Sequence, residues 1–353
     1  MRYFSSNFIG VILSETYEPM ISKIKSAKKK PIILLIGVGR FGEKHLNTLK
    51  ILEKKGSLSI AGALVATAKS QNKIAQKYSI PVWTELTDEL LKKVDAVDIV
   101  TPPENHFEIA LRCLPFADVL IEKPMTMNIA EAKKLAGFAQ KHKRILMVGH
   151  IYRFHPVTKR LKSLLDPFKK EAAFISGSFI NPKDSDNERP IAMELPHLFD
   201  IVDYIYNLAP IAISAKSFER TIITDIKYPQ KKHAVFRLGW EGDKKIRTMN
   251  FSFSKKKIES DFVENIIRIH DLEKNATDTI HCPSLITPLE EELSTFVDVI
   301  KRKKIDYPNA QTGARLVQIA EKSRPTEAQP RNTRKPKVAI IGGGIFGTNV
   351  AIE

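Results

Sequence analysis

Apolar and polar positions follow one pattern up to about residue 150 and another beyond it. In the first part, short and nearly continuous apolar runs alternate with amphipathic stretches of helical spacing. Such runs are typical of strands buried on both faces of a parallel sheet, and the stretches between them are typical of crossover helices. Strands are predicted at 31–36, 60–66, 94–100, 117–121 and 144–148. The pattern therefore predicts an α/β domain with a parallel sheet over residues 31–150.

The pattern beyond residue 150 is less regular and predicts a second domain over residues 151–324. Alternating stretches between residues 213 and 268 are typical of antiparallel strands. Helices are predicted at 156–165, 193–204, 287–300 and 313–322, and strands at 172–179, 233–240 and 247–253. A length of 353 residues agrees with two domains. Residues 1–30 are interpreted as a leader, and residues 325–336 as a polar, proline-containing linker.

Three glycines separate the first predicted strand from the first helix. Gly37 permits a tight turn, Gly39 lets the backbone approach a pyrophosphate, and Gly42 allows the helix to pack closely on the strand. In this strand–turn–helix context the spacing indicates a dinucleotide site. His45, in the helix that follows, is interpreted as a surface or packing residue.

The second predicted strand ends in Thr67-Ala68-Lys69-Ser70. An acidic residue at this point would bind the ribose 2′-hydroxyl of NAD, but the stretch has no carboxylate. A cation and a hydroxyl, from Lys69 and Ser70, suit a 2′-phosphate better. The sequence therefore favours NADP over NAD, with Lys69 as an ordinary surface lysine the alternative interpretation.

Two later strands also end in polar residues. Residues 101–106 contain two prolines, which hold that loop rigid as a wall beside a cofactor. The strand at 117–121 runs directly into Glu122-Lys123-Pro124. Ligands collect at the carboxyl ends of parallel strands, so Lys123 is a candidate for chemistry. The alternative is a solvated strand end that stops at a proline.

Four stretches in order, GVGRFG, TPPENH, IEKP and GHIYRFHP, resemble the motifs of the glucose-fructose oxidoreductase, inositol dehydrogenase and MocA (Gfo/Idh/MocA) family. The resemblance covers about residues 31–324. It implies a Rossmann domain followed by an α+β domain with a large open antiparallel sheet that often forms an oligomer interface, and closing helices that pack back on the first domain. The candidate cofactor-binding residues are Gly37, Gly39, Arg40, Phe41, Gly42, Lys69, Ser70, Thr101, Pro102, Asn105, His106, Glu122, Lys123 and Arg153.

The resemblance also implies an NAD(P)-dependent oxidoreductase that acts on a secondary alcohol of a sugar, cyclic polyol or nucleotide-sugar. Its candidate catalytic residues are Lys123, which would stabilise alkoxide charge, and His197, which would transfer the proton. Lys123 could itself be the acid or base. Many members carry an aspartate four residues before the histidine, where this chain has Met193. Glu194 is interpreted either as its replacement or as an exposed helix charge, and helical spacing would place it on one side with His197.

The end of the chain repeats the logic of its first glycine turn. Residues 337–341 are apolar-rich, and glycines at 342, 344 and 347 have dinucleotide-fingerprint spacing. The stretch resembles the start of an FAD-dependent protein of the amino-acid oxidase type. Residues 337–353 are therefore predicted to be the truncated start of a second dinucleotide-binding module in a longer polypeptide. An extra strand added to an existing sheet is the alternative.

Composition and charge narrow the function classes. The net charge is +16, with scattered lysines that indicate a solvated surface first, attraction of an anionic cofactor or substrate second, and nucleic acid third. The apolar runs are too short to span a bilayer, and two distant cysteines indicate buried thiols in a reducing cytoplasm and no metal site. An imine or dihydrodiol reductase and a nonenzymatic NADP-binding partner of a flavoprotein remain as alternatives.

Overall fold

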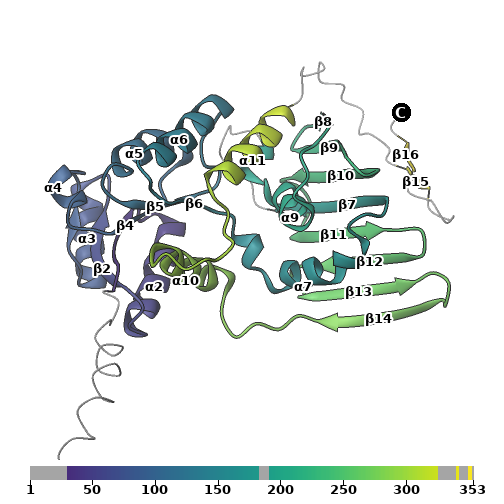
Figure 1. Ribbon diagram of the computed structural model, residues 1–353, viewed down its shortest axis with the longest axis horizontal. Coiled ribbons are helices and arrows are strands. Elements are labelled where there is room, and N and C mark those ends of the chain that lie inside the picture. The colour runs from purple at the N-terminus through teal and green to yellow at the C-terminus, as the bar shows by residue number, and fades with distance from the viewer. Residues whose placement is uncertain (1–29, 183–190, 325–338, 342–348, 352–353) are drawn as a thin grey trace, which may run out of the picture.

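The computed structural model describes residues 30–182, 191–324, 339–341 and 349–351, which form two main domains (Figure 1). The first is built on a six-stranded sheet of order β3-β2-β1-β4-β5-β6, in which all neighbouring strands run parallel. Its strands are β1 (Ile32–Ile36), β2 (Ser59–Leu64), β3 (Val82–Trp83), β4 (Ala96–Ile99), β5 (Asp118–Glu122) and β6 (Leu146–Gly149). The predicted Rossmann domain is confirmed.

Three of the described helices of the first domain begin at a capping side chain. The helices of this domain are α2 (Arg40–Lys54), α3 (Ala68–Tyr78), α4 (Asp88–Leu91), η1 (Pro103–Asn105), α5 (His106–Cys113) and α6 (Ile129–Lys141). The side chains of Thr67, Thr87 and Asn128 each accept a hydrogen bond from the backbone N–H three residues later. These bonds satisfy N–H groups that a helix leaves unpaired at its start, which is why α3, α4 and α6 begin there.

The second domain is built on an eight-stranded sheet of order β14-β13-β12-β11-β7-β10-β9-β8. Its strands are β7 (Ala173–Ile180), β8 (Ala212–Phe218), β9 (Thr221–Tyr228), β10 (Lys232–Gly239), β11 (Ile246–Ser252), β12 (Lys256–Asp261), β13 (Ile266–Asp271) and β14 (Ala276–His281). Neighbours are antiparallel except β7 and β10, which pair in parallel. The expected large, mostly antiparallel sheet is confirmed.

The remaining helices either cover the second sheet or pack back on the first domain. They are η2 (Ile151–Phe154), α7 (Pro156–Leu165), η3 (Asp166–Phe168), α8 (Ile191–Glu194), α9 (His197–Tyr206), α10 (Pro288–Ile300) and α11 (Ala310–Lys322). The helices α7 and α9 lie over the second sheet, whereas α10 packs on α2 and α11 packs on α6 (Figure 1). The closing helices thus return to the first domain, as the family resemblance implies.

One predicted helix is wrong. Residues 193–204 do not form a single helix, because α8 ends at Glu194 and α9 begins at His197. Pro196 lies between them as the N-cap of α9. Proline has no N–H to donate and disfavours helical geometry in the residue before it, here Leu195. Spacing along one helix therefore says nothing about how Glu194 and His197 are placed relative to each other.

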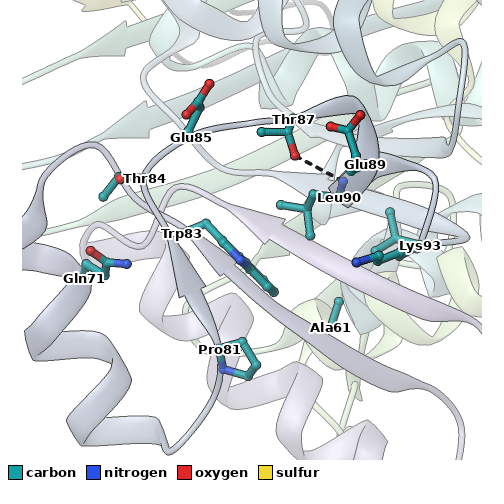
Figure 2. A pocket seen from close by; sticks show the side chains of 11 residues that line it. Ala61, Gln71, Pro81, Trp83, Thr84, Glu85, Thr87, Glu89, Leu90 and Lys93 are labelled. Carbon is teal, nitrogen blue, oxygen red and sulfur yellow. Dashed lines mark hydrogen bonds between the residues drawn. The ribbon is translucent and has the colours of Figure 1, made fainter.

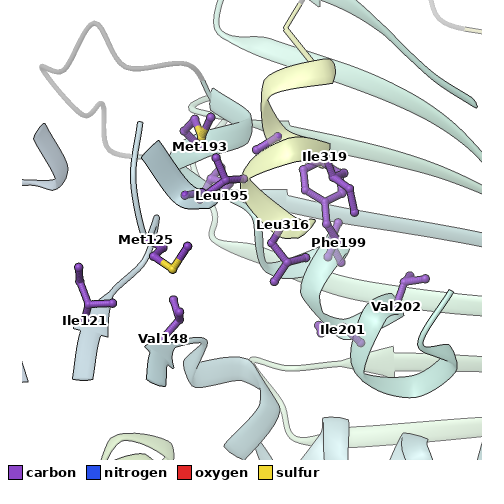
Figure 3. Packing of buried hydrophobic residues seen from close by; sticks show 14 of the residues in the cluster. Ile121, Met125, Val148, Met193, Leu195, Phe199, Ile201, Val202, Leu316 and Ile319 are labelled. Carbon is purple, nitrogen blue, oxygen red and sulfur yellow. The ribbon is translucent and has the colours of Figure 1, made fainter. Parts of the chain in front are cut away.

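The apolar core runs continuously from one domain into the other. On one side of the first sheet, residues of α2 such as Leu49 pack with residues of α10 such as Phe296. On the other side, Met125 and Val148 belong to the same buried cluster as Leu316 of α11 and the residues of α9 (Figure 3). Because this packing fixes the two domains against each other, side chains from both can form one site.

Two short strands near the chain end, β15 (Ala339–Ile341) and β16 (Asn349–Ala351), pair with each other in antiparallel fashion. The glycines of the predicted second fingerprint lie outside the described residues, as do residues 1–29. The second dinucleotide-binding module therefore stays a prediction. Within the described part of the chain, no helix is both long and apolar enough to cross a membrane.

Candidate active site

The glycine turn between β1 and α2 has the geometry that a dinucleotide requires. Gly37 has a φ of +94°, and a Cβ on it would lie 2.7 Å from the carbonyl oxygen of Val100. A Cβ on Gly42 would lie 2.0 Å from the carbonyl oxygen of Gly37. Gly39, the N-cap of α2, has open space where its Cβ would be and no side-chain cap. The first N–H groups of α2 can therefore face a pyrophosphate, with Arg40 and Phe41 exposed beside them.

Two substitutions separate the roles of these glycines. We expect Gly42→Ala to lower the free energy of unfolding by about 3 kcal/mol, because the added methyl meets fixed backbone. Gly39→Ala should keep the wild-type stability but weaken NADPH binding at least about tenfold, since the methyl occupies the space that the pyrophosphate approaches. Thermal unfolding and NADPH fluorescence titration measure both effects. A Gly39→Ala variant that binds like the wild type would contradict this assignment.

The predicted ribose-binding stretch lies at the start of α3. Thr67 Oγ1 accepts a hydrogen bond from the backbone N–H of Ser70 at 3.2 Å. Lys69 is exposed in the first turn of the helix, which contains no acidic residue. The helix N-terminus and the lysine together make this end of β2 positive, which suits a phosphate better than a free hydroxyl pair.

The wall predicted beside the nicotinamide is tied to the Glu122-Lys123-Pro124 stretch by His106. This histidine is fully buried, and its two ring nitrogens lie 2.9 Å from the carbonyl oxygens of Thr101 and Pro124. Burial lowers its pKa. Asn105 closes the turn by donating its backbone N–H to Pro102. His106 thus holds two loops together at the sheet edge, and its ring nitrogens are engaged with backbone.

The charge of Lys123 acts on His197 across the domain boundary. Lys123 follows β5 and is half-buried, and His197 is a buried residue at the first position of α9. Burial, followed by the positive charges of Lys123 and Arg247, holds the pKa of His197 well below its usual range. Among the described residues, His197 Nδ1 has no hydrogen-bond partner. His197 thus favours its neutral form in the field of Lys123, and the catalytic roles of the two residues stay a prediction.

Aromatic rings enclose the imidazole. The ring centroid of Tyr152 lies 4.6 Å from that of His197, and the centroid of Phe179 lies 5.7 Å from it. His150 is also buried, and burial followed by the charge of Arg153 lowers its pKa to about 3. These surroundings keep the imidazole dry and uncharged.

Two predicted cofactor-binding side chains turn towards the protein interior. Glu122 is buried, and its Oε2 accepts the backbone N–H of Lys123 at 3.1 Å. Arg153 is buried too, and it donates from Nε to Asp200 at 2.7 Å and from Nη2 to Asp203 at 2.8 Å. Because both aspartates belong to α9, Arg153 fixes the helix that carries His197.

The first domain matches a known protein family. Residues 32–150 match the family described as the oxidoreductase family with an NAD-binding Rossmann fold, Gfo/Idh/MocA. This domain belongs to the Gfo/Idh/MocA family.

Relatives of known name extend the comparison. The chain is 27% identical over 183 residues to UDP-N-acetylglucosamine 3-dehydrogenase from Acidithiobacillus ferrooxidans, a match covering 52% of this chain and 54% of that protein. It is 34% identical over 127 residues to 4-carboxy-2-hydroxymuconate-6-semialdehyde dehydrogenase from a Sphingobium species (35% and 39% covered) and 27% identical over 135 residues to scyllo-inositol 2-dehydrogenase (NAD(+)) from Bacillus subtilis (37% and 39%). The matches span about half or less of these relatives.

The fold likeness extends further than the sequence likeness. The solved structure of the Acidithiobacillus ferrooxidans enzyme superposes with a TM-score of 0.75 at 22% identity, covering 84% of this chain and 97% of that one. The two-domain architecture of the Gfo/Idh/MocA family is therefore shared beyond the matched first domain.

The Gfo/Idh/MocA aspartate expected four residues before the histidine has an apolar replacement here. Met193 is fully buried, and it lines a small hollow together with Met125 and Leu316 (Figure 3). A carboxylate would be desolvated in such a place. Glu194 lies on α8, and its side chain is outside the described atoms, so its role as a replacement stays a prediction.

Several buried polar residues near the Gfo/Idh/MocA motifs were not predicted from the sequence. His45 was interpreted as a surface or packing residue, and only the surface interpretation is wrong, because this residue is fully buried and faces Asp98. Two local signals were available. His45 precedes Leu46 and Leu49 on the buried face of α2, and Asp98 interrupts an apolar strand run, where a charge needs a partner. Glu292 and Arg247 carried no comparable signal.

A cavity of about 570 Å³ lies elsewhere, at the β3 edge of the Rossmann sheet (Figure 2). Trp83 stands at its centre, with Gln71, Thr87 and Lys93 around it. None of the four Gfo/Idh/MocA motifs lines it. The cavity is therefore distinct from the pair formed by Lys123 and His197.

Proposed function

We propose that the protein is an NAD(P)-dependent oxidoreductase that transfers a hydride between nicotinamide and a secondary alcohol or ketone of a sugar, cyclic polyol or nucleotide-sugar. The observation that carries the proposal is the neutral, buried His197 beside the charge of Lys123. This pair lies at the carboxyl edge of a parallel sheet whose glycine turn is open to a dinucleotide. The names of the relatives in the same family support this substrate range.

The chemistry divides between cofactor and protein. The bound nicotinamide would accept or return the hydride. Removing a hydride from an alcohol requires a base for the hydroxyl proton, and His197 is suited to this because its low pKa keeps the imidazole unprotonated. Lys123 would stabilise the negative charge that develops on the oxygen. Proton transfer by Lys123 itself is the alternative assignment.

Positive charge around the pair supports an anionic substrate. Arg247 is buried and donates through Nη1 to the carbonyl oxygen of Ile180 at 2.8 Å, while its buried Nε has no partner among the described residues. Lys245, two residues earlier, is exposed, and its charge also acts on His197. A diphosphate would neutralise these cations. Within the proposed range we therefore favour a nucleotide-sugar, which is the kind of substrate that the name of the first relative states.

We further propose NADP as the preferred cofactor, on the support of Lys69. Lys69→Ala should raise the dissociation constant of NADPH about tenfold, because a charge-assisted hydrogen bond to the 2′-phosphate is worth about 1.5–3 kcal/mol. Binding of NADH should be unchanged. Fluorescence titration measures both, with Lys141→Ala as the control for loss of an exposed lysine elsewhere. An equal loss for both cofactors, or a wild type that prefers NADH, would refute the preference.

The open sheet is the proposed site of homo-oligomerisation. The helices α7 and α9 lie over one face of this sheet (Figure 1). On the strands β7, β9 and β10, buried residues alternate with half-exposed ones. A second copy could cover the half-exposed face. Light scattering of the purified protein tests this, and a monomer at micromolar concentration would count against it.

A turnover panel tests the main proposal. The protein would be incubated with NADP or NAD and a set of polyols, sugars and uridine diphosphate sugars, with a dihydrodiol as a further arm, and separately with NADPH or NADH and a cyclic imine. We expect reduction of the nicotinamide with a sugar or nucleotide-sugar. Turnover confined to the dihydrodiol or imine arm would favour the alternative reductase. Tight cofactor binding with no turnover would favour the nonenzymatic partner.

A further inference from the structure

Four ionisable side chains meet in the interior directly behind the proposed reaction centre. They come from four separate elements and are His45 of α2, Asp98 of β4, Glu122 of β5 and Glu292 of α10. His45, Asp98 and Glu292 are 0% exposed and Glu122 is 7% exposed. Charged groups are rarely buried unless they are paired, so this cluster needs an explanation.

The hydrogen bonds of the cluster are incomplete. His45 Nδ1 lies 2.9 Å from Asp98 Oδ2, which leaves His45 Nε2 pointing towards Glu122 Oε1 at 3.4 Å. Both carboxylate oxygens of Glu292 are buried without a partner among the described residues. Ligand-type atoms of His45, Glu122 and Glu292 all lie within 4.8 Å of one another. The three side chains therefore point into one small polar space.

The charges of these four side chains must be largely neutralised in the protein interior. Three ionised carboxylates against one imidazole would leave an excess of negative charge in a dry interior, at high cost. Burial alone would lower the pKa of His45, but Asp98 and Glu122 outweigh it and raise that pKa well above its usual range. Burial and the nearby Glu122 raise the pKa of Glu292. The negative charges of Asp98 and of Asp200, which lies on α9, raise the pKa of Glu292 further.

The backbone around Glu122 connects this cluster to the chemistry. Glu122 Oε2 accepts the N–H of Lys123. A Cβ on Gly149 of β6 would come within 2.6 Å of Glu122 Oε1, so the carboxylate would have to shift if residue 149 carried a side chain. His45 lies three residues after Gly42, on the helix that begins at the glycine turn. The cluster thus links the cofactor-binding helix to the peptide that carries Lys123.

We propose that His45 and Glu292 are positioning residues: an imidazolium at His45 faces the Glu122 carboxylate, a neutral carboxylic acid at Glu292 removes a competing charge beside it, and the Glu122 carboxylate in turn holds the backbone of Lys123. Protons in place of a bound cation neutralise the cluster. The effect on catalysis rests on the proposed function, whereas the protonation states of the two side chains do not.

A double-mutant cycle tests the positioning role. His45→Gln should lower kcat about 10- to 100-fold, the usual cost of a small misplacement of a reacting group. Because His45 acts through Glu122, the same change should have little further effect in a Glu122→Gln background. An equal fold-loss in both backgrounds would overturn the proposal.

Glu292 offers a matched pair of variants. Glu292→Gln preserves a neutral hydrogen-bond donor and should keep kcat within about twofold, whereas Glu292→Leu should lower it like His45→Gln. The melting temperature of each variant is measured alongside, and Glu292→Gln provides a folded variant if Glu292→Leu does not fold. A Glu292→Gln variant as impaired as a folded Glu292→Leu would show that the carboxylate is needed ionised and would overturn the proposal.

One readout needs no activity. In a histidine-labelled sample, the NMR signal of His45, assigned by its loss in His45→Gln, should be that of an imidazolium at pH 7.5. Metal analysis of the purified protein should find no stoichiometric divalent cation. A neutral His45, or one equivalent of metal that Glu292→Gln releases, would overturn the proposal. If the wild type shows no turnover on any substrate, the proposed function fails while these two measurements still decide the state of the cluster.

Discussion

Lys123→Met lowers kcat by at least about 10³-fold while leaving the affinity for NADPH within about twofold of the wild type. A fall in kcat of this size is expected when the substrate oxygen loses both its electrostatic stabilisation and the group that assists its proton transfer. Methionine keeps most of the apolar stem of lysine and removes its charge and its N–H donors. NADPH affinity should survive because the glycine turn and α3, which bind the pyrophosphate and ribose in our proposal, are separate from β5.

Steady-state kinetics and NADPH fluorescence together measure this effect. Lys141→Met is the matched control, since Lys141 is exposed in the last turn of α6 and should behave as wild type. Unchanged turnover in Lys123→Met would remove Lys123 from the mechanism. Lost turnover together with lost cofactor binding would instead assign Lys123 to binding.

His197→Asn should lower kcat/KM for alcohol oxidation by about 10²–10⁴-fold, the usual contribution of a positioned general base. Asparagine retains a hydrogen-bonding side chain of similar reach but cannot accept the proton. In the wild type, the pKa of His197 lies well below its usual value of 6.5 because of burial and the charges of Lys123 and Arg247. The base is therefore active above that lowered pKa and is lost by protonation only as the pH falls through it.

The pH dependence of kcat/KM tests the assignment of His197 as the base. The acidic limb of kcat/KM for the wild type should fall below pH 6.5, and it should disappear in His197→Asn. His233→Asn serves as the control, because His233 is part-exposed on β10 and paired with Asp225 at 3.0 Å. An acidic limb that persists in His197→Asn belongs to another group and would favour proton transfer by Lys123.

Local patterns predicted most of the first domain. Strands covered on both faces need apolar residues at every position, so their runs are visible without knowing any partner. The glycine turn was equally legible, because its sterics involve backbone within a few residues and one neighbouring strand. The cap of α6 is equally local, since Asn128 accepts the N–H of Glu131 at 2.9 Å. Interactions between residues three or four positions apart can therefore be predicted from the sequence pattern.

The site was predicted only in part. The pairing of Lys123 and His197 came from a family resemblance and stays a prediction, although the charge of Lys123 does lower the pKa of His197. The partners of Arg153 on α9 were not foreseen, because 47 and 50 residues separate the paired positions. The break at Pro196 was missed because the apolar spacing around it continues in helical register.

The sequence by itself determined the two-domain order, the parallel and antiparallel character of the sheets and the dinucleotide turn. These features depend on steric and solvation preferences that act between near neighbours. Only the tertiary structure decided which way Glu122 and Arg153 point, and that His45, Asp98 and Glu292 share one buried space. These contacts join residues that are far apart in the sequence. The free-energy cost of burying their charges depends on which side chains lie nearby, and a local sequence pattern does not contain that information.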